Sequence, residues 1–105
     1  MAEFDIVVHG GRLIDGTGNP WFYGDIGIKD SKIASIGKIQ PGAGRRAISA
    51  KGYVVTPGYI DMHTHSDQPL IADGNAQSKV RQGVTLDIIG ESQSVAPLEG
   101  AILEE

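Results

Sequence analysis

Two histidines one residue apart, His63 and His65, stand in the stretch GYIDMHTHSD, which spans residues 58–67. The segment before them is short and apolar, as in a strand, and successive side chains on a strand alternate between its two faces. Both imidazoles are therefore predicted to point the same way from the end of that strand. Two neutral imidazoles so placed can ligate one divalent ion, with zinc–nitrogen distances of about 2.0–2.1 Å. The alternative interpretation is a pair of ordinary histidines in a surface turn.

The composition limits what a protein can do with such a site. The 105 residues suit one ordinary domain, and 40% hydrophobic with 21% charged residues is typical of a globular chain. The net charge of −4 disfavours nucleic acid as a partner. The sequence has no cysteine, so a disulfide, a thiolate ligand and a thiol nucleophile are all excluded. Any metal must be held by nitrogen and oxygen.

The N-terminus and the hydropathy pattern favour a cytoplasmic protein. The opening residues, MAEFDIVVHGG, carry acids where a secretory signal needs a basic start. No stretch approaches the roughly 20 apolar residues that a membrane-spanning helix needs. We therefore expect a cytoplasmic location and no membrane partner.

Fifteen glycines, most of them spread through the first ninety residues, predict short strands joined by tight turns. Residues 24–37 alternate apolar and polar types around Asp30 and Ser31, which predicts a hairpin with these two residues at its tip. Residues 4–8 and 12–15 are predicted to be two extended pieces that meet at a glycine turn. Two further strands are expected over residues 46–50 and 53–57. The first half of the chain is thus predicted to be an antiparallel β region.

The pattern changes after residue 57. Residues 59–63 predict a strand, residues 75–82 a helix that ends at a glycine, and residues 84–90 a second strand. Strand, helix and strand in this order are typical of a βαβ unit with a parallel strand pair. In such sheets the carboxyl ends of the strands line the ligand crevice, and the two histidines fall at such an end.

The stretch VVTPGYIDMHTHSD closely resembles the motif that opens the barrel of the amidohydrolase superfamily. In that family a Pro-Gly turn leads into the first strand of a (β/α)8 barrel, and the His-x-His pair at its end binds a catalytic metal. DIVVHGGRLIDGTGNPWFYGDIGIKDSKIASIG is similar to the N-terminal β-sandwich strands of these enzymes, and SKVRQGVT to the stretch between the first two barrel strands. DGTGNPWF is similar to the N-acyl-D-amino-acid deacylase (D-aminoacylase) branch.

The resemblance implies an α/β fold with an all-β part. Residues 1–56 would form a β-sandwich portion, and residues 57–105 would begin a TIM-like (β/α)8 barrel with strand 1, helix 1 and strand 2. The implied cofactor is zinc or another divalent metal, as one or two ions, bound by His63 and His65. Zinc lowers the pKa of a bound water to about 7 and polarises an amide carbonyl, so no protein nucleophile is needed.

The resemblance implies hydrolysis of a C–N bond in a small-molecule amide, an N-acyl-D-amino acid. An alternative within the superfamily is a cyclic amide, as in dihydroorotase- or hydantoinase-like members. The non-enzymatic alternative is a truncated, non-catalytic β-rich binding or scaffold fragment.

Two carboxylates are further candidates for the site. Asp61 falls on the same predicted strand face as His63 and could orient an imidazole through a hydrogen bond, as carboxylates do beside metal-bound histidines. Alternatively, it accepts hydrogen bonds from backbone N–H groups near the strand. Where the deacylase branch has Gly-Asn-Cys-Gly, this sequence has GESQ, and Ser92 takes the place of the cysteine. Glu91 is therefore a candidate carboxylate ligand to the metal, with an exposed loop acid as the alternative.

Length sets a further expectation. A (β/α)8 barrel takes about 250 residues, and the residues after 58 leave room for two barrel strands and one helix. The later ligands implied by the resemblance, two histidines and an aspartate, have no counterpart in this chain. We therefore expect the N-terminal part of a longer enzyme, with no catalytic base of its own and inactive alone. Two parallel strands cannot bury both faces unaided, so association with the rest of the barrel or with copies of itself is expected.

Overall fold

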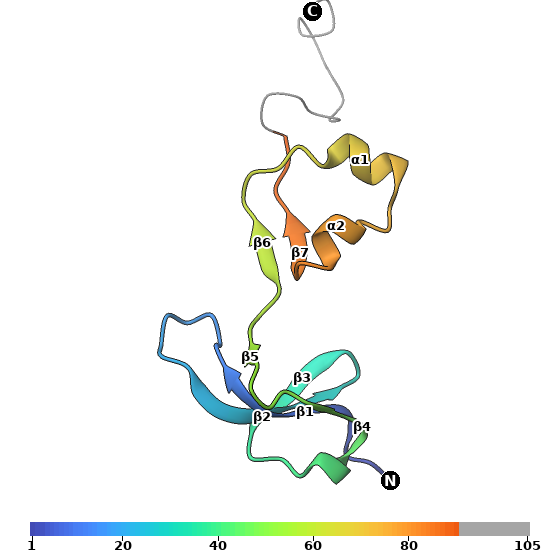
Figure 1. Cartoon of the computed structure of the whole chain (residues 1–105). Coiled ribbons are helices and arrows are strands. Elements are labelled where there is room, and N and C mark those ends of the chain that lie inside the picture. Colours follow the sequence, from blue (N-terminus) through green and yellow to red (C-terminus); the bar gives the residue numbers. More distant parts are fainter. Residues whose placement is uncertain (91–105) are drawn as a thin grey trace, which may run out of the picture. The chain divides into compact units, whose positions relative to one another are not determined.

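The computed structural model describes residues 1–90, which are mostly strands with a few short helices (Figure 1). The chain divides into two compact units, one from Met1 to Pro57 and the other beginning at Gly58. In the described part of the chain, no helix is long and apolar enough to cross a membrane.

The first unit is a five-stranded sheet in the order β3-β2-β1-β4, with β5 also paired to β1. The pairs β1–β2 and β2–β3 are antiparallel, whereas β4 and β5 both run parallel to β1. A short 3-10 turn, η1, precedes β4. The elements are β1 (Phe4–Leu13), β2 (Phe22–Lys29), β3 (Lys32–Gly37), η1 (Pro41–Ala43), β4 (Gly44–Ser49) and β5 (Val54–Val55).

Two expectations for this unit were wrong. The predicted glycine turn after residue 8 is a bulge within one continuous strand, because Gly10 adopts a left-handed φ of 75° and the register with β2 shifts between Val8 and Gly11. The region is also not wholly antiparallel. After β3 the chain passes through η1 to the other edge of β1, so that β4 and β5 enter the sheet parallel to it.

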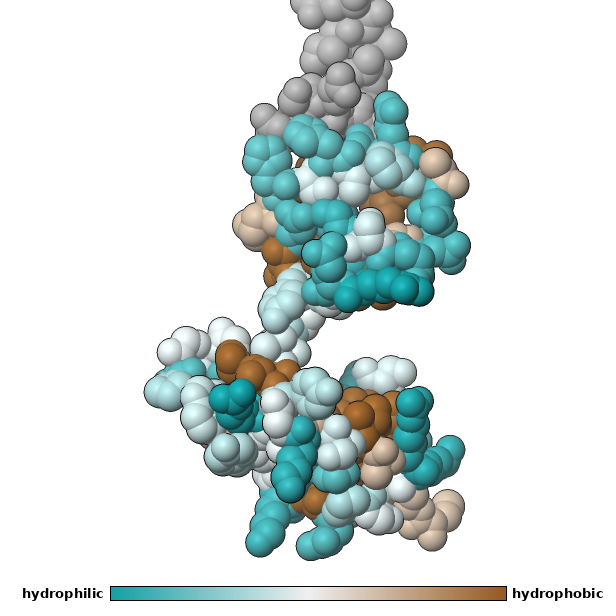
Figure 2. All heavy atoms as spheres, in the orientation of Figure 1, coloured by the Kyte–Doolittle hydropathy of each residue, from teal (hydrophilic) through white to brown (hydrophobic). Residues whose placement is uncertain are grey.

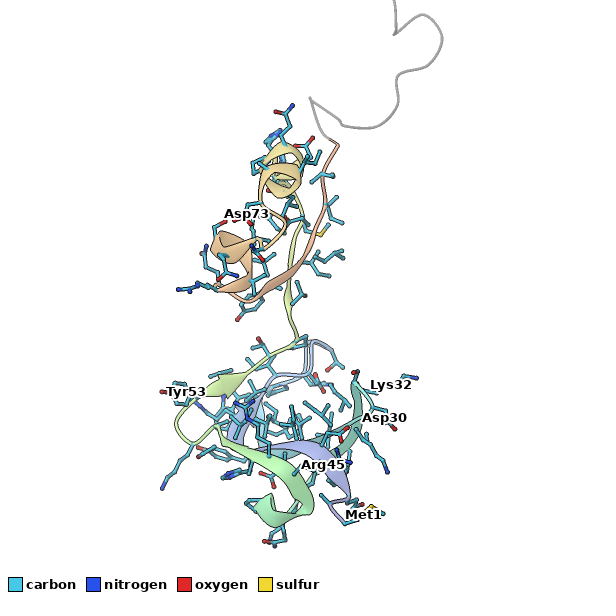
Figure 3. All side chains as sticks on the ribbon, turned by 90° about the vertical axis from the view of Figure 1, so that its right-hand side faces the viewer. Met1, Asp30, Lys32, Arg45, Tyr53 and Asp73 are labelled. Atoms are coloured by element: carbon cyan, nitrogen blue, oxygen red, sulfur yellow. The ribbon has the colours of Figure 1, made fainter. Side chains whose placement is uncertain are left out.

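The predicted hairpin is confirmed. Asp30 and Ser31 both have left-handed φ angles, 50° and 61°, as a two-residue type I′ turn requires. Asp30 lies with Lys32 at the tip of the β2–β3 hairpin in Figure 3. The backbone N–H of Asp30 donates to Asp5 Oδ2 at 2.9 Å. This bond fastens the tip to the central strand.

The core of the first unit is small. Phe4, Val7, Leu13 and Ala50 are its buried apolar residues, and only Val7 is fully buried. Large apolar side chains stay exposed, and Figure 2 shows apolar surface on this unit. They include Trp21, Tyr23, Ile33, Ile36 and Tyr53. A sheet with uncovered apolar side chains fits the predicted β-sandwich portion, because a sandwich buries such a face against a second sheet.

Over its described residues, 58–90, the second unit forms a parallel strand pair joined by two short helices. The elements are β6 (Tyr59–Asp61), α1 (Asp67–Ala72), α2 (Gln77–Val80) and β7 (Val84–Asp87). β6 pairs with β7 in parallel, as predicted, and both helices lie to one side of the pair (Figure 1). A Cβ at Gly58 would collide with the Thr85 side chain. The chain therefore needs glycine where it enters β6.

The crossover differs from the single helix predicted over residues 75–82. α2 begins only at Gln77, because Ala76 takes a left-handed φ of 50° and Asn75 donates twice to Asp73 Oδ1, from its backbone at 3.0 Å and from its side chain at 2.9 Å. The additional helix α1 was not predicted. Asp67 and Pro69 are residue types that a first helical turn accepts, and they were the available signal.

Asp25 holds the bulge of β1 in place. Its Oδ1 accepts the N–H of Gly10 at 2.8 Å, and its Oδ2 accepts the N–H of Ile39 at 2.9 Å. These hydrogen bonds, that from Ile39 foremost, hold the pKa of Asp25 below its ordinary value. One carboxylate thus fixes both the bulge and the exit from β3.

Replacing Asp25 with asparagine should remove an acid-sensitive part of the stability. Because the folded-state pKa is lowered, the carboxylate stabilises the fold above its unfolded pKa of about 3.9, and this contribution is lost as the pH falls through the folded value. We expect Asp25→Asn to lower the free energy of unfolding by about 1 kcal/mol at neutral pH. Urea titrations at several pH values should show the difference vanishing in strong acid. An unchanging difference across the pH range would contradict this role.

Replacing Gly27 with alanine should overpack the core. A Cβ at Gly27 would lie 2.6 Å from the Phe4 ring, which is 7% exposed and closely packed. We expect Gly27→Ala to lower the free energy of unfolding by about 1–3 kcal/mol in urea titrations. Gly42→Ala is the matched control, because a Cβ there meets nothing within 4 Å. Equal stability of the two variants would show that the Phe4 ring moves aside freely.

Candidate metal site

The two histidines follow β6 directly. The strand predicted over residues 59–63 is shorter than expected, because β6 ends at Asp61; His63 lies in a bend and His65 in irregular structure. Backbone pairing nevertheless continues past the end of the strand. The N–H of Ile88 donates to the Asp61 carbonyl at 2.8 Å, and the N–H of Thr64 donates to the Ile88 carbonyl at 3.2 Å. The histidine segment is thereby fastened to the chain that continues from β7.

The two imidazole rings lie close together and are exposed. Their centroids are 5.5 Å apart and their planes are inclined by 58°. A zinc ion about 2.0–2.1 Å from one nitrogen of each ring, with tetrahedral angles, would place the centroids about 5 Å apart. The observed separation therefore fits one shared ion. The role of His63 and His65 as ligands stays a prediction.

Two imidazoles supply only part of a metal site. Across residues 1–90, no group of three or more histidine, aspartate or glutamate side chains is arranged to hold an ion. The predicted carboxylate ligand Glu91 lies outside the described residues, as does its neighbour Ser92. The proposed role of Glu91 stays a prediction.

Asp61 makes the backbone contact that was the alternative interpretation of this residue. Its Oδ1 accepts the N–H of His63 at 3.2 Å, and its Oδ2 accepts a hydrogen bond from Lys79 Nζ. The hydrogen bond from Lys79, then that from His63, hold the pKa of Asp61 below its ordinary value. Contact between Asp61 and an imidazole stays a prediction.

Lys79 and Asp87 belong to the same polar cluster, and neither was expected there. Lys79 Nζ donates to Thr64 Oγ1 at 3.0 Å and lies 3.8 Å from Asp87 Oδ1. The hydrogen bond to Asp61 is the main reason that the pKa of Lys79 is raised. The hydroxyl of Ser66 donates to Asp87 Oδ2 at 2.5 Å. The available sequence signal was an acid, Asp87, inside the apolar run VTLDIIG.

Comparison with known proteins bears on what this arrangement is. No family model matches the chain. The chain is 39% identical over 99 residues to the D-aminoacylase of Alcaligenes xylosoxydans xylosoxydans, which corresponds to 93% of this chain and 20% of that enzyme. The chain thus spans about a fifth of the length of the curated relatives that it matches.

Solved structures give the same likeness in three dimensions. A D-aminoacylase with a binuclear metal centre matches with a TM-score of 0.84 at 40% identity, over 93% of this chain and 21% of that one. An N-acyl-D-glutamate deacylase from Bordetella bronchiseptica, in complex with zinc and a phosphonate inhibitor, matches with a TM-score of 0.77 at 38% identity. That match covers 84% of this chain and 19% of the deacylase.

The chain has a strand-rich first unit and then a parallel strand pair, with His63 and His65 after the first strand of that pair, and it therefore resembles the N-terminal part of an amidohydrolase. Within that class, the chain is similar to the N-acyl-D-amino-acid deacylases, D-aminoacylase among them. The resemblance predicted from the sequence is confirmed.

Proposed function

We propose that this chain is the N-terminal part of a metal-dependent amidohydrolase that removes the acyl group from N-acyl-D-amino acids. The observation that carries the proposal is the pair of imidazoles, 5.5 Å apart, directly after the first strand of a parallel pair. The similarity to D-aminoacylase over 93% of the chain supports the choice of substrate class.

The site would hold one or two ions of zinc or another divalent metal. His63 and His65 would bind one of these ions, with Glu91 as a further ligand. When bound, the ion would lower the pKa of a bound water and polarise the amide carbonyl of the substrate. The chain's own contribution is to present two exposed imidazoles from a segment that is fastened at Asp61 and Thr64. No base or acid for the reaction is assigned within this chain.

The proposal includes the fold around the site. Residues 1–56 are assigned to a β-sandwich portion, and residues 57–105 to the start of a (β/α)8 barrel. In this assignment β6 is strand 1, α1 and α2 are the connection, and β7 is strand 2. Apolar side chains on both strands and directly after them are exposed: Ile60 and Leu86 on the strands, and Met62 and Ile88 just beyond their ends. This supports association with further barrel strands, because a parallel sheet is normally covered on both faces.

Removing either imidazole should abolish metal-dependent hydrolysis. In the intact protein, we expect His63→Ala and His65→Ala to lower kcat/KM for N-acetyl-D-leucine more than about 100-fold, a larger loss than removal of a residue that only supports a ligand. Both variants should also retain less zinc after dialysis, measured by mass spectrometry. His9→Ala is the control, because His9 lies on β1 in the other unit. Full zinc content and activity in both site variants would refute the proposed ligands.

The substrate class is tested with the same preparations. N-acetyl-D-leucine, its L enantiomer and the cyclic amides hydantoin and dihydroorotate are offered to the zinc-loaded wild type. Hydrolysis of the D compound alone is the expected result. Cleavage of a cyclic amide alone would instead show that the protein is a cyclic amidohydrolase. A wild type that takes up no zinc and cleaves none of them would favour a scaffold.

Glu91→Gln tests the remaining candidate ligand. An amide is a much weaker zinc ligand than a carboxylate, so we expect the variant to bind less zinc than the wild type in a calorimetric titration. Glu3→Gln serves as the control for loss of a surface charge. Zinc uptake equal to that of the wild type would remove Glu91 from the site.

A further inference from the structure

We propose that Lys79 is a positioning residue that sets the geometry of the His63–His65 segment by bridging the ends of β6 and β7. The inference rests on the proposed function, because it assigns Lys79 to the same metal site. Lys79 acts through other side chains and is not proposed as a ligand.

The first support is where the ammonium holds the chain. Lys79 Nζ donates to Asp61 Oδ2 and to Thr64 Oγ1, the latter at 3.0 Å. Asp61 precedes His63 by two residues, and Thr64 stands between His63 and His65. The Lys79 side chain therefore hydrogen-bonds to the histidine segment at two points, at its start and between its two histidines.

The second support is that the segment has no regular strand to define it. Beyond Asp61, the N–H of His63 donates to Asp61 Oδ1 at 3.2 Å, and the N–H of Thr64 donates to the Ile88 carbonyl at 3.2 Å. Asp61 can hold both the His63 N–H and the Lys79 ammonium at once because it uses one oxygen for each. Lys79 thus orients the carboxylate that orients the backbone of His63.

The third support is the charge balance at the strand ends. Asp61 and Asp87 are partners in the parallel register, and the Asp87 side chain is only 12% exposed. Asp87 Oδ1 is buried and accepts no hydrogen bond in the described structure, so the Lys79 ammonium at 3.8 Å compensates its charge. Without this cation, two carboxylates would face each other, which drives such groups apart.

The cluster also reaches the far end of the histidine segment. Ser66, directly after His65, donates its hydroxyl to Asp87 Oδ2 at 2.5 Å. Asp61 and Ser66 flank the two histidines, and both are tied to Lys79, one directly and one through Asp87. The spacing of the two rings therefore depends on a network centred on one ammonium.

The test compares Lys79→Met, which keeps the aliphatic stem and loses the charge, with Lys79→Arg, which keeps the charge. In the intact protein, we expect Lys79→Met to weaken zinc binding about 10–100-fold in a chelator competition, as for other residues that orient metal ligands. Its cobalt-substituted form should show shifted absorption bands, because the ligand geometry changes. Lys79→Arg should restore most of the affinity and the wild-type bands. Lys32→Met, at the hairpin tip of the first unit, is the control.

A second variant covers the case in which Lys79→Met fails to fold. Thr64→Val removes one hydrogen bond without changing charge or shape, and we expect zinc affinity about fivefold lower than in the wild type. Thr64→Ser, which keeps the hydroxyl, should bind zinc as the wild type does.

Hydrogen exchange of the metal-free protein gives a readout that does not involve zinc. In Lys79→Met, a peptide covering residues 61–66 should exchange at least tenfold faster, with β1 unchanged. Wild-type exchange, affinity and cobalt spectrum in Lys79→Met would overturn the role of Lys79 and leave the proposed function standing. Failure of the wild type itself to bind zinc would instead refute the proposed function.

Discussion

The parallel pairing of β6 with β7 is the constraint on which the candidate site depends. Parallel register places Asp61 opposite Asp87, so two carboxylates meet where both strands end. Parallel strands also require a crossover, and here Lys79, on the crossover helix α2, extends its ammonium to the carboxylates at the ends of both strands. The crossover that allows the parallel pairing therefore also supplies Lys79, whose positive charge offsets the repulsion between Asp61 and Asp87.

The exposed surface of the second unit follows from the same arrangement. Over residues 58–90, two short strands and two short helices offer few positions that are shielded from water, and the most buried residues in this range are the polar Ser66 and Asp67. Hydrogen bonds and ion pairs thus define the local structure around the histidines more than apolar packing does. In this network the buried Asp87 Oδ1 accepts no hydrogen bond and relies on the nearby Lys79 ammonium, so removal of that one member should disturb the geometry.

Local patterns predicted the elements whose determinants are local. The β2–β3 hairpin is specified by Asp30 and Ser31 at its own tip, and the parallel pair by a polar, helix-forming stretch between two apolar ones. The bulge at Gly10 was missed because the same glycine suits a turn or a bulge, and Asp25, fifteen residues away, decides between them. Likewise, the short α2 depends on the turn that Asp73 and Asn75 form before it.

The site shows the same division between local and distant determinants. The spacing of His63 and His65 is visible in the sequence, but the backbone of their segment is held by hydrogen bonds with Ile88, on the far side of the crossover. From the sequence alone, Lys79 is an ordinary surface cation. The parallel register of β6 and β7 brings Asp61 and Asp87 together, and Lys79 lies close to both. A catalytic zinc ion usually takes three protein ligands and keeps one position open for water or substrate. In the proposed site His63 and His65 would supply two of these ligands, and Glu91 is the candidate for a third.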